Sequence, residues 1–269
     1  MRELGQIERA RVCAVSFLNT APLVWGMEHG PQRGVFDVSY AVPSACADAV
    51  AAGAADIGLV PVAEIARLGL HIAPGVGIAC RGAVRSILLV SKVAVRQIRT
   101  LAADTSSRTS VELARVILRE KFGVAPEFIR MSPSLASMLG AADAALLIGD
   151  AALRLEPAEL PFVTLDLGAE WVEMTGRPFV FAAWAGRARH VTPEVGRVFV
   201  TSYEYGRAHL DDLVEAEARR RGFDEGLVRR YLTEHIRFEL GEPEREGLRL
   251  FLDYAGLGGN LKVAESVTS

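Results

Sequence analysis

Along the first two-thirds of the chain, short apolar runs alternate with segments whose apolar positions recur at helical spacing. The runs RVCAVS at 11–16 and DAALLIGD at 143–150 have the length and composition of buried strands. The segment SVELARVILREKFG at 110–123 instead places Val111 and Ile117 on one face of a helix. Strands that alternate with helices in this way predict an α/β fold.

The alternating pattern starts afresh near residue 92 and gives way to helices near residue 185. We therefore expect two lobes, with lobe two (92–182) inserted into lobe one (1–91 plus 183–269). The chain is predicted to cross between them near Ser91–Lys92 and again near Phe181–Ala183. A ligand cleft is expected between the lobes, beyond the carboxyl ends of the strands.

The last third predicts a helical tail. Thr192 and Pro193 have the pattern of an N-cap followed by a first helical residue. Helical spacing then continues from Val195 to Ala216, and two further helices are expected at 225–235 and 244–255, with a short strand between them. This tail either covers lobe one or forms a homodimer contact.

Composition narrows the functional classes. The 269 residues include 30 Lys and Arg against 33 Asp and Glu, a net charge of −3, which predicts no nucleic-acid partner and no binding to an anionic membrane. No apolar stretch is long enough to span a membrane, and MRELGQIERARVC has no secretory apolar core. The expected location is cytoplasmic.

Cysteines and histidines are scattered along the chain. The three cysteines each lie in an apolar run, which is typical of buried free thiols in a reducing compartment. The five histidines have no metal-ligand spacing with one another or with a cysteine, so no metal site is expected. Motifs of the Walker, GxGxxG, GxSxG and CxxC types are absent, which gives no sign of nucleotide, hydrolase or redox chemistry.

Polar residues gather where strands are predicted to end, and we take these residues as the candidate site. They are Ser16, Asn19, Ser44, Ser86, Thr105, Ser106, Ser107, Arg108, Thr109, Gly149 and Asp150.

The stretch DTSSRTS at 104–110 is the most informative of these. A helix that begins here would present free N–H groups and a partial positive charge to a carboxylate or phosphate, and Arg108 would add a charged contact. Thr109 and Glu112 also fit a capping box, but a box needs only one hydroxyl. Anion binding is therefore favoured over capping alone.

Several candidates have a simpler structural alternative. Ser44 and Asp150 each precede a helical pattern. An N-cap is favoured over a ligand contact for Ser44, whereas an N-cap and a cleft position are equally favoured for Asp150. Thr20 serves as the N-cap before Ala21, which leaves Asn19 without a capping role. Asp56 and Glu64 are expected at helix ends or in ion pairs rather than as general bases, and the aromatic run FVFAAW is expected in the core or at the hinge.

Five segments together resemble the chorismate dehydratases of the futalosine route to menaquinone. They are SFLNTAPL, ADIGLVPVAE, DTSSRTSVEL, LLIGDAAL and DLGAEWVEMTGRPFVFAAW, in that order. The resemblance implies a two-lobed fold like type II periplasmic binding proteins and the dehydration of chorismate to 3-[(1-carboxyvinyl)oxy]benzoate with no cofactor. It further implies catalytic roles for Asn19 and Ser86 and substrate contacts from Ser107 and Thr109. Arg177 departs from the apolar residue expected before Pro-Phe.

The residues at these strand ends are mostly neutral hydrogen-bond donors rather than bases. We therefore hypothesise that the enolpyruvyl carboxylate of chorismate removes the ring proton itself. Asn19 and Ser86 would hold this carboxylate within reach of the proton. Two alternatives stay open: a small-molecule binding protein of the same fold, and the sister enzyme of the pathway that forms the dihydroxynaphthoate. SFLNT argues against the sister enzyme, which opens with a different motif.

Overall fold

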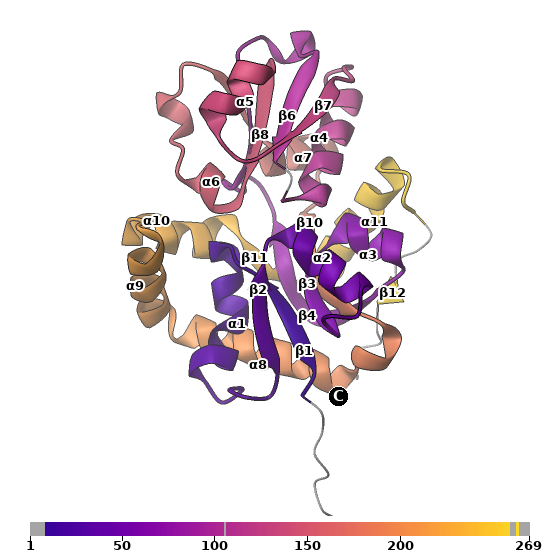
Figure 1. Cartoon of the computed structure of the whole chain (residues 1–269), viewed down its shortest axis with the longest axis vertical. Helices are drawn as coiled ribbons and strands as arrows, with labels where there is room; N and C mark the ends of the chain where they lie inside the picture. The colour runs from indigo at the N-terminus through magenta and orange to yellow at the C-terminus, as the bar shows by residue number, and fades with distance from the viewer. Residues whose placement is uncertain (1–8, 105, 259–261, 264–269) are drawn as a thin grey trace, which may run out of the picture.

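The computed structural model describes residues 9–104, 106–258 and 262–263. Two sheets lie one above the other, each flanked by helices (Figure 1). We call the elements around the seven-stranded sheet lobe one and those around the five-stranded sheet lobe two. No helix in the described ranges is long and apolar enough to cross a membrane.

The sheet of lobe one contains strands from both ends of the chain. β1 pairs in parallel with β2 and β3, whereas β10 runs antiparallel to β3 and β4, and β12 (Lys262–Val263) joins β4 in parallel. The strand order is β11 (Arg237–Glu239), β4 (His71–Cys80), β10 (Phe179–Gly186), β3 (Ile57–Pro61), β1 (Arg11–Val15) and β2 (Asp37–Ala41).

The sheet of lobe two is formed by the middle of the chain. Its two parallel pairs, β6–β7 and β6–β8, are followed by two antiparallel pairs, β5–β8 and β5–β9. The strand order is β7 (Glu127–Met131), β6 (Thr100–Asp104), β8 (Ala144–Ile148), β5 (Ile87–Ser91) and β9 (Val163–Asp166). All residues of β5 and β8 are buried, as expected for apolar runs at the centre of a sheet.

Helices connect the strands at the places where the sequence predicts them. Lobe one holds α1, α2 and α3 together with the tail, and lobe two holds α4 to α7 (Figure 1). Their bounds are α1 (Ala21–His29), α2 (Pro43–Ala51), α3 (Val62–Leu68), α4 (Arg108–Glu120), α5 (Leu135–Ala141), α6 (Gly149–Leu153), α7 (Leu167–Thr175), α8 (Pro193–Ala208), α9 (Leu210–Arg221), α10 (Glu225–Arg230) and α11 (Glu242–Tyr254).

Strand pairing places the first change of sheet earlier than the sequence predicted. β5 precedes the expected crossing at Ser91–Lys92, yet it already pairs with β8 and β9. The chain therefore changes sheet between Cys80 and Ile87. An apolar strand such as SILLVS suits either sheet, because only its hydrogen-bonding partners distinguish the two.

The second change of sheet falls between α7 and β10, where the tail packs against the chain. This is earlier than the crossing predicted near Phe181–Ala183, because β10 already pairs with β4 from Phe179 onward. Trp171 of α7, Phe179 of β10 and Phe251 of α11 contact one another edge to face, with ring centroids 4.8–6.0 Å apart. Arg177 forms an exposed ion pair with Glu246 of α11 at 2.5 Å. The aromatic run therefore belongs largely to the core and the hinge, as expected.

The tail lies on lobe one and reaches the space between the lobes (Figure 1). Trp184 of β10 stacks on Phe199 of α8, with ring centroids 4.3 Å apart and planes 4° apart. Thr192 caps α8 by accepting a hydrogen bond from the N–H of Val195. The single long helix expected from 195 to 216 is instead two helices, because His209 leaves the helical conformation between them (φ −113°, ψ 37°). The expected homodimer contact stays a prediction.

A substitution at Gly247 tests how closely α11 packs against the chain at the second change of sheet. A Cβ at this position would lie 2.0 Å from the carbonyl oxygen of Pro178, which is backbone and cannot move aside cheaply. We expect Gly247→Ala to lower the free energy of unfolding by about 1–3 kcal/mol in urea titrations. The control is Gly140→Ala in α5, where nothing lies within 4 Å, and stability should be unchanged or slightly raised. Equal midpoints for the two variants would contradict this packing.

Candidate active site

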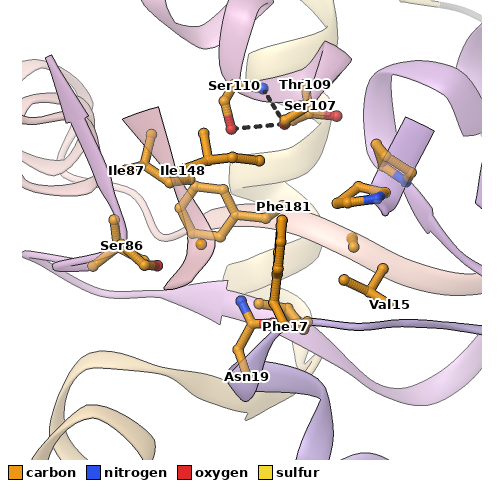
Figure 2. Close-up of a pocket in the computed structure, with 16 residues that line it drawn as sticks. Val15, Phe17, Asn19, Ser86, Ile87, Ser107, Thr109, Ser110, Ile148 and Phe181 are labelled. Atoms are coloured by element: carbon orange, nitrogen blue, oxygen red, sulfur yellow. Dashed lines mark hydrogen bonds between the residues drawn. The ribbon is translucent and has the colours of Figure 1, made fainter. Parts of the chain in front are cut away.

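A cavity that is open at its mouth lies between the two lobes. Figure 2 shows Asn19 and Ser86 on one side and Ser107, Thr109 and Ser110 on the other, with phenylalanine rings between the two groups. The lining residues come from both sheets: Val15, Phe17, Asn19, Pro43, Pro61, Ile78, Val84, Ser86, Ile87, Ser107, Thr109, Ser110, Ile148, Gly149, Phe181 and Ala182. We call this cavity the cleft.

The SFLNT turn places Asn19 in the cleft. The chain leaves β1 at Val15 and forms one short 3-10 turn, Leu18–Thr20, before α1 begins. Asp150 of α6 anchors this turn across the lobes, because its Oδ1 accepts a hydrogen bond from the N–H of Leu18 at 3.0 Å. Asn19 Oδ1 is buried without a hydrogen-bond partner in the described structure, so it is left as an acceptor for a ligand.

Arg221 of α9 completes this anchor. Its guanidinium forms an ion pair with Asp150 and donates to the carbonyl oxygen of Ser16 at 3.0 Å. It also pairs with Glu217 at 2.7 Å, and its side chain is only 11% exposed. The tail, the SFLNT turn and lobe two therefore meet at one cluster of buried charge.

Ser86 lies in the first crossing, where the backbone is tightly held. Arg85 has a φ of 66°, which is unusual for a residue other than glycine and often marks a functional position. The carboxylate of Asp166 holds this conformation by accepting from the N–H groups of Val84 at 2.9 Å and Arg85 at 2.6 Å. The carbonyl oxygen of Ser86 accepts from the N–H of Gly149 at 2.8 Å, so Ser86 is fixed against lobe two.

Hydroxyl groups at the start of α4 form the opposite side of the cleft. Ser107 is the N-cap of this helix, since its Oγ accepts from the N–H of Ser110 at 3.1 Å and lies 2.9 Å from Ser110 Oγ (Figure 2). Thr109 Oγ1 accepts from the N–H of Ala63 at 3.1 Å, which joins α4 to α3 of lobe one. The capping box expected at Thr109 is wrong by two residues, because α4 begins earlier.

Four helices begin at the cleft wall. Pro43 opens α2, Pro61 precedes α3, Ser107 caps α4 and Gly149 opens α6. The N-terminal end of a helix carries a partial positive charge, and several such ends at the wall of one cavity favour an anion there. The cleft can therefore attract negative charge without a cationic side chain.

Arg108 does not line the cleft. Its guanidinium lies 2.9 Å from Asp48 of α2 and 2.8 Å from Glu64 of α3, and these carboxylates, Asp48 first, raise the pKa of Arg108. Arg67 of α3 joins the same cluster through Glu64 at 2.6 Å and Glu112 of α4 at 2.7 Å. These ion pairs connect the two lobes beside the cleft, which leaves Arg108 engaged with protein carboxylates.

The remaining candidates divide in a simple way. Asn19, Ser86, Ser107, Thr109 and Gly149 line the cleft, whereas Thr105 lies outside the described residues. Those that do not line it are Ser16, Ser44, Ser106, Arg108 and Asp150.

The caps fitted to Ser44 and Asp150 are wrong, and Thr20 holds the N-cap position of α1 without a side-chain cap hydrogen bond. α2 begins at Pro43 after Val42, so Ser44 lies within the helix, and its N–H donates to the carbonyl oxygen of Ser106 at 3.0 Å. Asp150 lies inside α6, where it anchors the SFLNT turn instead. Thr20 makes no cap hydrogen bond because its backbone is already helical, and its hydroxyl is buried without a partner in the described structure.

Tyr231 contacts Ser86, and the sequence did not predict this contact. Its hydroxyl lies 2.8 Å from Ser86 Oγ, and its side chain is buried although it belongs to the tail. Burial raises the pKa of Tyr231, and hydrogen bonds with Ser86 and Asn19 partly offset this rise. A tyrosine about 145 positions after Ser86 in the sequence carries no local signal of this contact.

Ionisable groups do not line the cleft. None of the residues listed above for its wall carries an ionisable side chain, so hydroxyl and amide groups supply its side-chain polarity. Asp56 pairs with Arg11 at 2.8 Å, and Asp104 accepts from Ser106, so both carboxylates are engaged elsewhere. Within the described ranges, no group of three or more His, Cys, Asp or Glu side chains is arranged to hold a metal.

Comparisons with known proteins identify the family. A family model described as menaquinone biosynthesis matches residues 10–256. The chain belongs to this menaquinone-biosynthesis family. A chorismate dehydratase from Thermus thermophilus is 33% identical over 261 residues, which cover 90% of this chain and 93% of that protein. The enzyme class expected from the ordered motifs, a hydro-lyase, is thereby confirmed.

Solved structures confirm the fold of this menaquinone-biosynthesis family member. A protein from Archaeoglobus fulgidus superposes with a TM-score of 0.73 at 17% identity, covering 94% of this chain and 98% of the other. The periplasmic aliphatic sulphonate binding protein of Escherichia coli superposes with a TM-score of 0.63 at 15% identity, covering 93% and 86%. The periplasmic-binding-protein-like fold predicted from the sequence is therefore present.

Asp150→Ala tests the anchor of the SFLNT turn in this family member. The change removes the acceptor of the Leu18 N–H and one partner of the buried Arg221, so we expect the free energy of unfolding to fall by about 1–3 kcal/mol in urea. The control is Arg197→Ala, which breaks an exposed ion pair with Glu194 and should cost less than about 0.5 kcal/mol. An Asp150→Ala variant as stable as this control would show that the anchor contributes nothing.

Proposed function

We propose that the protein is a chorismate dehydratase, which removes water from chorismate to give 3-[(1-carboxyvinyl)oxy]benzoate in the futalosine route to menaquinone, without a cofactor. The observation that carries the proposal is a cleft with neutral hydrogen-bond donors at two ends and no ionisable lining residue in the described structure. The 33% sequence identity with the Thermus thermophilus chorismate dehydratase supports the same reaction.

The shape of the cleft suits this substrate. Chorismate has a six-membered ring with one carboxylate on the ring and a second on the enolpyruvyl group. The rings of Phe17 and Phe181 offer apolar surface to the substrate ring, while hydroxyl and amide groups lie at the two ends (Figure 2). The start of α4, with Ser107 and Ser110, would hold one carboxylate. The Ser86 hydroxyl and the amide N–H of Asn19 would hold the other.

The reaction breaks the C3–H and C4–O bonds of the ring and forms the C3–C4 double bond that completes the aromatic system. The C3 proton is acidified by conjugation with the ring carboxylate, so donors around that carboxylate stabilise the charge that develops. The enolpyruvyl carboxylate, attached through oxygen to C3, takes this proton. It then returns the proton to the departing hydroxide, so that water leaves and the carboxylate is regenerated.

The neutrality of the cleft explains why the substrate would act as its own base. A tethered base gains up to about 7–11 kcal/mol over a free one through its fixed position. Asn19 and Ser86 would direct the carboxylate toward C3 and donate a hydrogen bond to the leaving hydroxyl. Because chorismate is a dianion that does not cross membranes unaided, we place the reaction in the cytoplasm.

Incubation with chorismate, followed by mass spectrometry, tests the activity. We expect a product lighter by one water, and we expect Asn19→Ala and Ser86→Ala each to lower kcat by about 100-fold through loss of a donor. Asp56→Asn and Asp104→Asn are the controls and should retain activity, since both carboxylates lie outside the cleft lining. Chorismate that is bound but unchanged would indicate a binding protein, and no interaction would indicate the sister enzyme or another reaction.

The pH dependence of kcat tests the identity of the base. A substrate carboxylate is fully ionised near neutral pH, so we expect kcat to be flat between about pH 6 and pH 9. A protein base with a pKa tuned toward neutrality would give a sloping limb in that range. A limb that disappears in one of the Asp56, Glu64, Asp104 or Asp150 variants would overturn the substrate-as-base mechanism.

A further inference from the structure

Tyr231 is the tail residue that contacts Ser86. The dehydration mechanism described above assigns it no role. It begins a π-helical segment, Tyr231–His235, between α10 and β11. π-Helical segments are rare in proteins, and those that do occur often lie at functional sites. The segment touches the first crossing twice, because Tyr231 Oη lies 2.8 Å from Ser86 Oγ and His235 Nδ1 lies 3.0 Å from the carbonyl oxygen of Ala83.

The backbone around Ser86 is already fixed without Tyr231. Asp166 holds Val84 and Arg85 through their N–H groups, and Gly149 donates to the carbonyl oxygen of Ser86. These backbone contacts do not fix the rotation of the Ser86 hydroxyl. This rotation decides whether the single hydroxyl proton points into the cleft or away from it. Ser86 is 2% exposed, so a protein group rather than bulk water controls this rotation.

Tyr231 is placed to donate to Ser86, because its hydroxyl lies 2.8 Å from Ser86 Oγ. Burial raises the pKa of its phenol, which therefore stays protonated. Ser86 and Asn19 lower that pKa in part, but burial outweighs them.

We propose that Tyr231 is a positioning residue, which donates a hydrogen bond to Ser86 Oγ and so directs the Ser86 proton at the bound substrate. The inference rests on the proposed function, because an oriented donor at Ser86 matters where a hydroxyl group leaves. Through this contact, the helical tail would set the hydrogen-bond direction at a residue of the first crossing.

A double-mutant cycle on chorismate turnover tests this role. We expect Tyr231→Phe, which keeps the ring and removes the hydroxyl, to lower the single-turnover rate about tenfold with KM changed less than about twofold. In the Ser86→Ala background the same change should have no further effect, because Tyr231 acts through Ser86. Enzyme in excess over chorismate keeps the slow variants measurable.

The matched control is Tyr203→Phe. Tyr203 is also a buried tail tyrosine, but its hydroxyl lies 3.3 Å from Glu239 and it does not line the cleft, so we expect wild-type rates. Tyr231→Phe within about twofold of wild type overturns the inference. The inference is also overturned if Tyr231→Phe lowers the single-turnover rate by the same factor in the wild-type and Ser86→Ala backgrounds. That pattern indicates a structural effect that is independent of Ser86.

A readout without turnover separates this inference from the proposed function. The buried Tyr231 hydroxyl proton should give a slowly exchanging NMR resonance that is absent in Tyr231→Phe and shifted in Ser86→Ala. Wild-type protein that leaves chorismate unchanged overturns the dehydratase proposal, and the NMR result then decides whether Tyr231 orients Ser86. A Tyr231 resonance that Ser86→Ala does not move overturns the positioning role.

Discussion

The carboxylate of Asp150 joins three parts of the chain that are far apart in sequence. It accepts the N–H of Leu18 in the SFLNT turn, pairs with Arg221 of the tail and belongs to α6 of lobe two. Asn19 is the next residue after Leu18, so this carboxylate helps to place it in the cleft, together with the contact from Arg221 to the carbonyl oxygen of Ser16. A contact between the lobes therefore takes part in positioning the cleft residues.

The charged residues around the cleft are engaged with one another, and this engagement gives the cleft its character. Arg108 and Arg221 lie close to it, but each is paired with protein carboxylates. An anionic ligand therefore meets helix N-termini and neutral donors instead of a guanidinium. Such an environment leaves a carboxylate of the ligand more basic than a salt bridge would, which the proposed reaction requires.

The sequence predicted the architecture well and the charged contacts poorly. The alternation of strands and helices, the inserted lobe and the clustering of Asn19, Ser86, Ser107 and Thr109 follow from local patterns and from the ordered motifs. The sheet to which β5 belongs, and the partners of Arg108, depend on contacts between distant segments that no local pattern encodes. Tyr231 could not be found for the same reason, since a tyrosine in a helical tail has no feature that marks it as a neighbour of Ser86.

The position of Tyr231 and Arg221 in the chain has a consequence for biosynthesis. Both belong to the last quarter of the sequence, whereas the turn and the serine that they contact belong to the first third. A ribosome therefore releases Asn19 and Ser86 long before it makes the residues that fix them. The sheet of lobe two and the central strands of lobe one are therefore made before the tail, whereas the contacts that fix Asn19 and Ser86 can form only after the tail has been made.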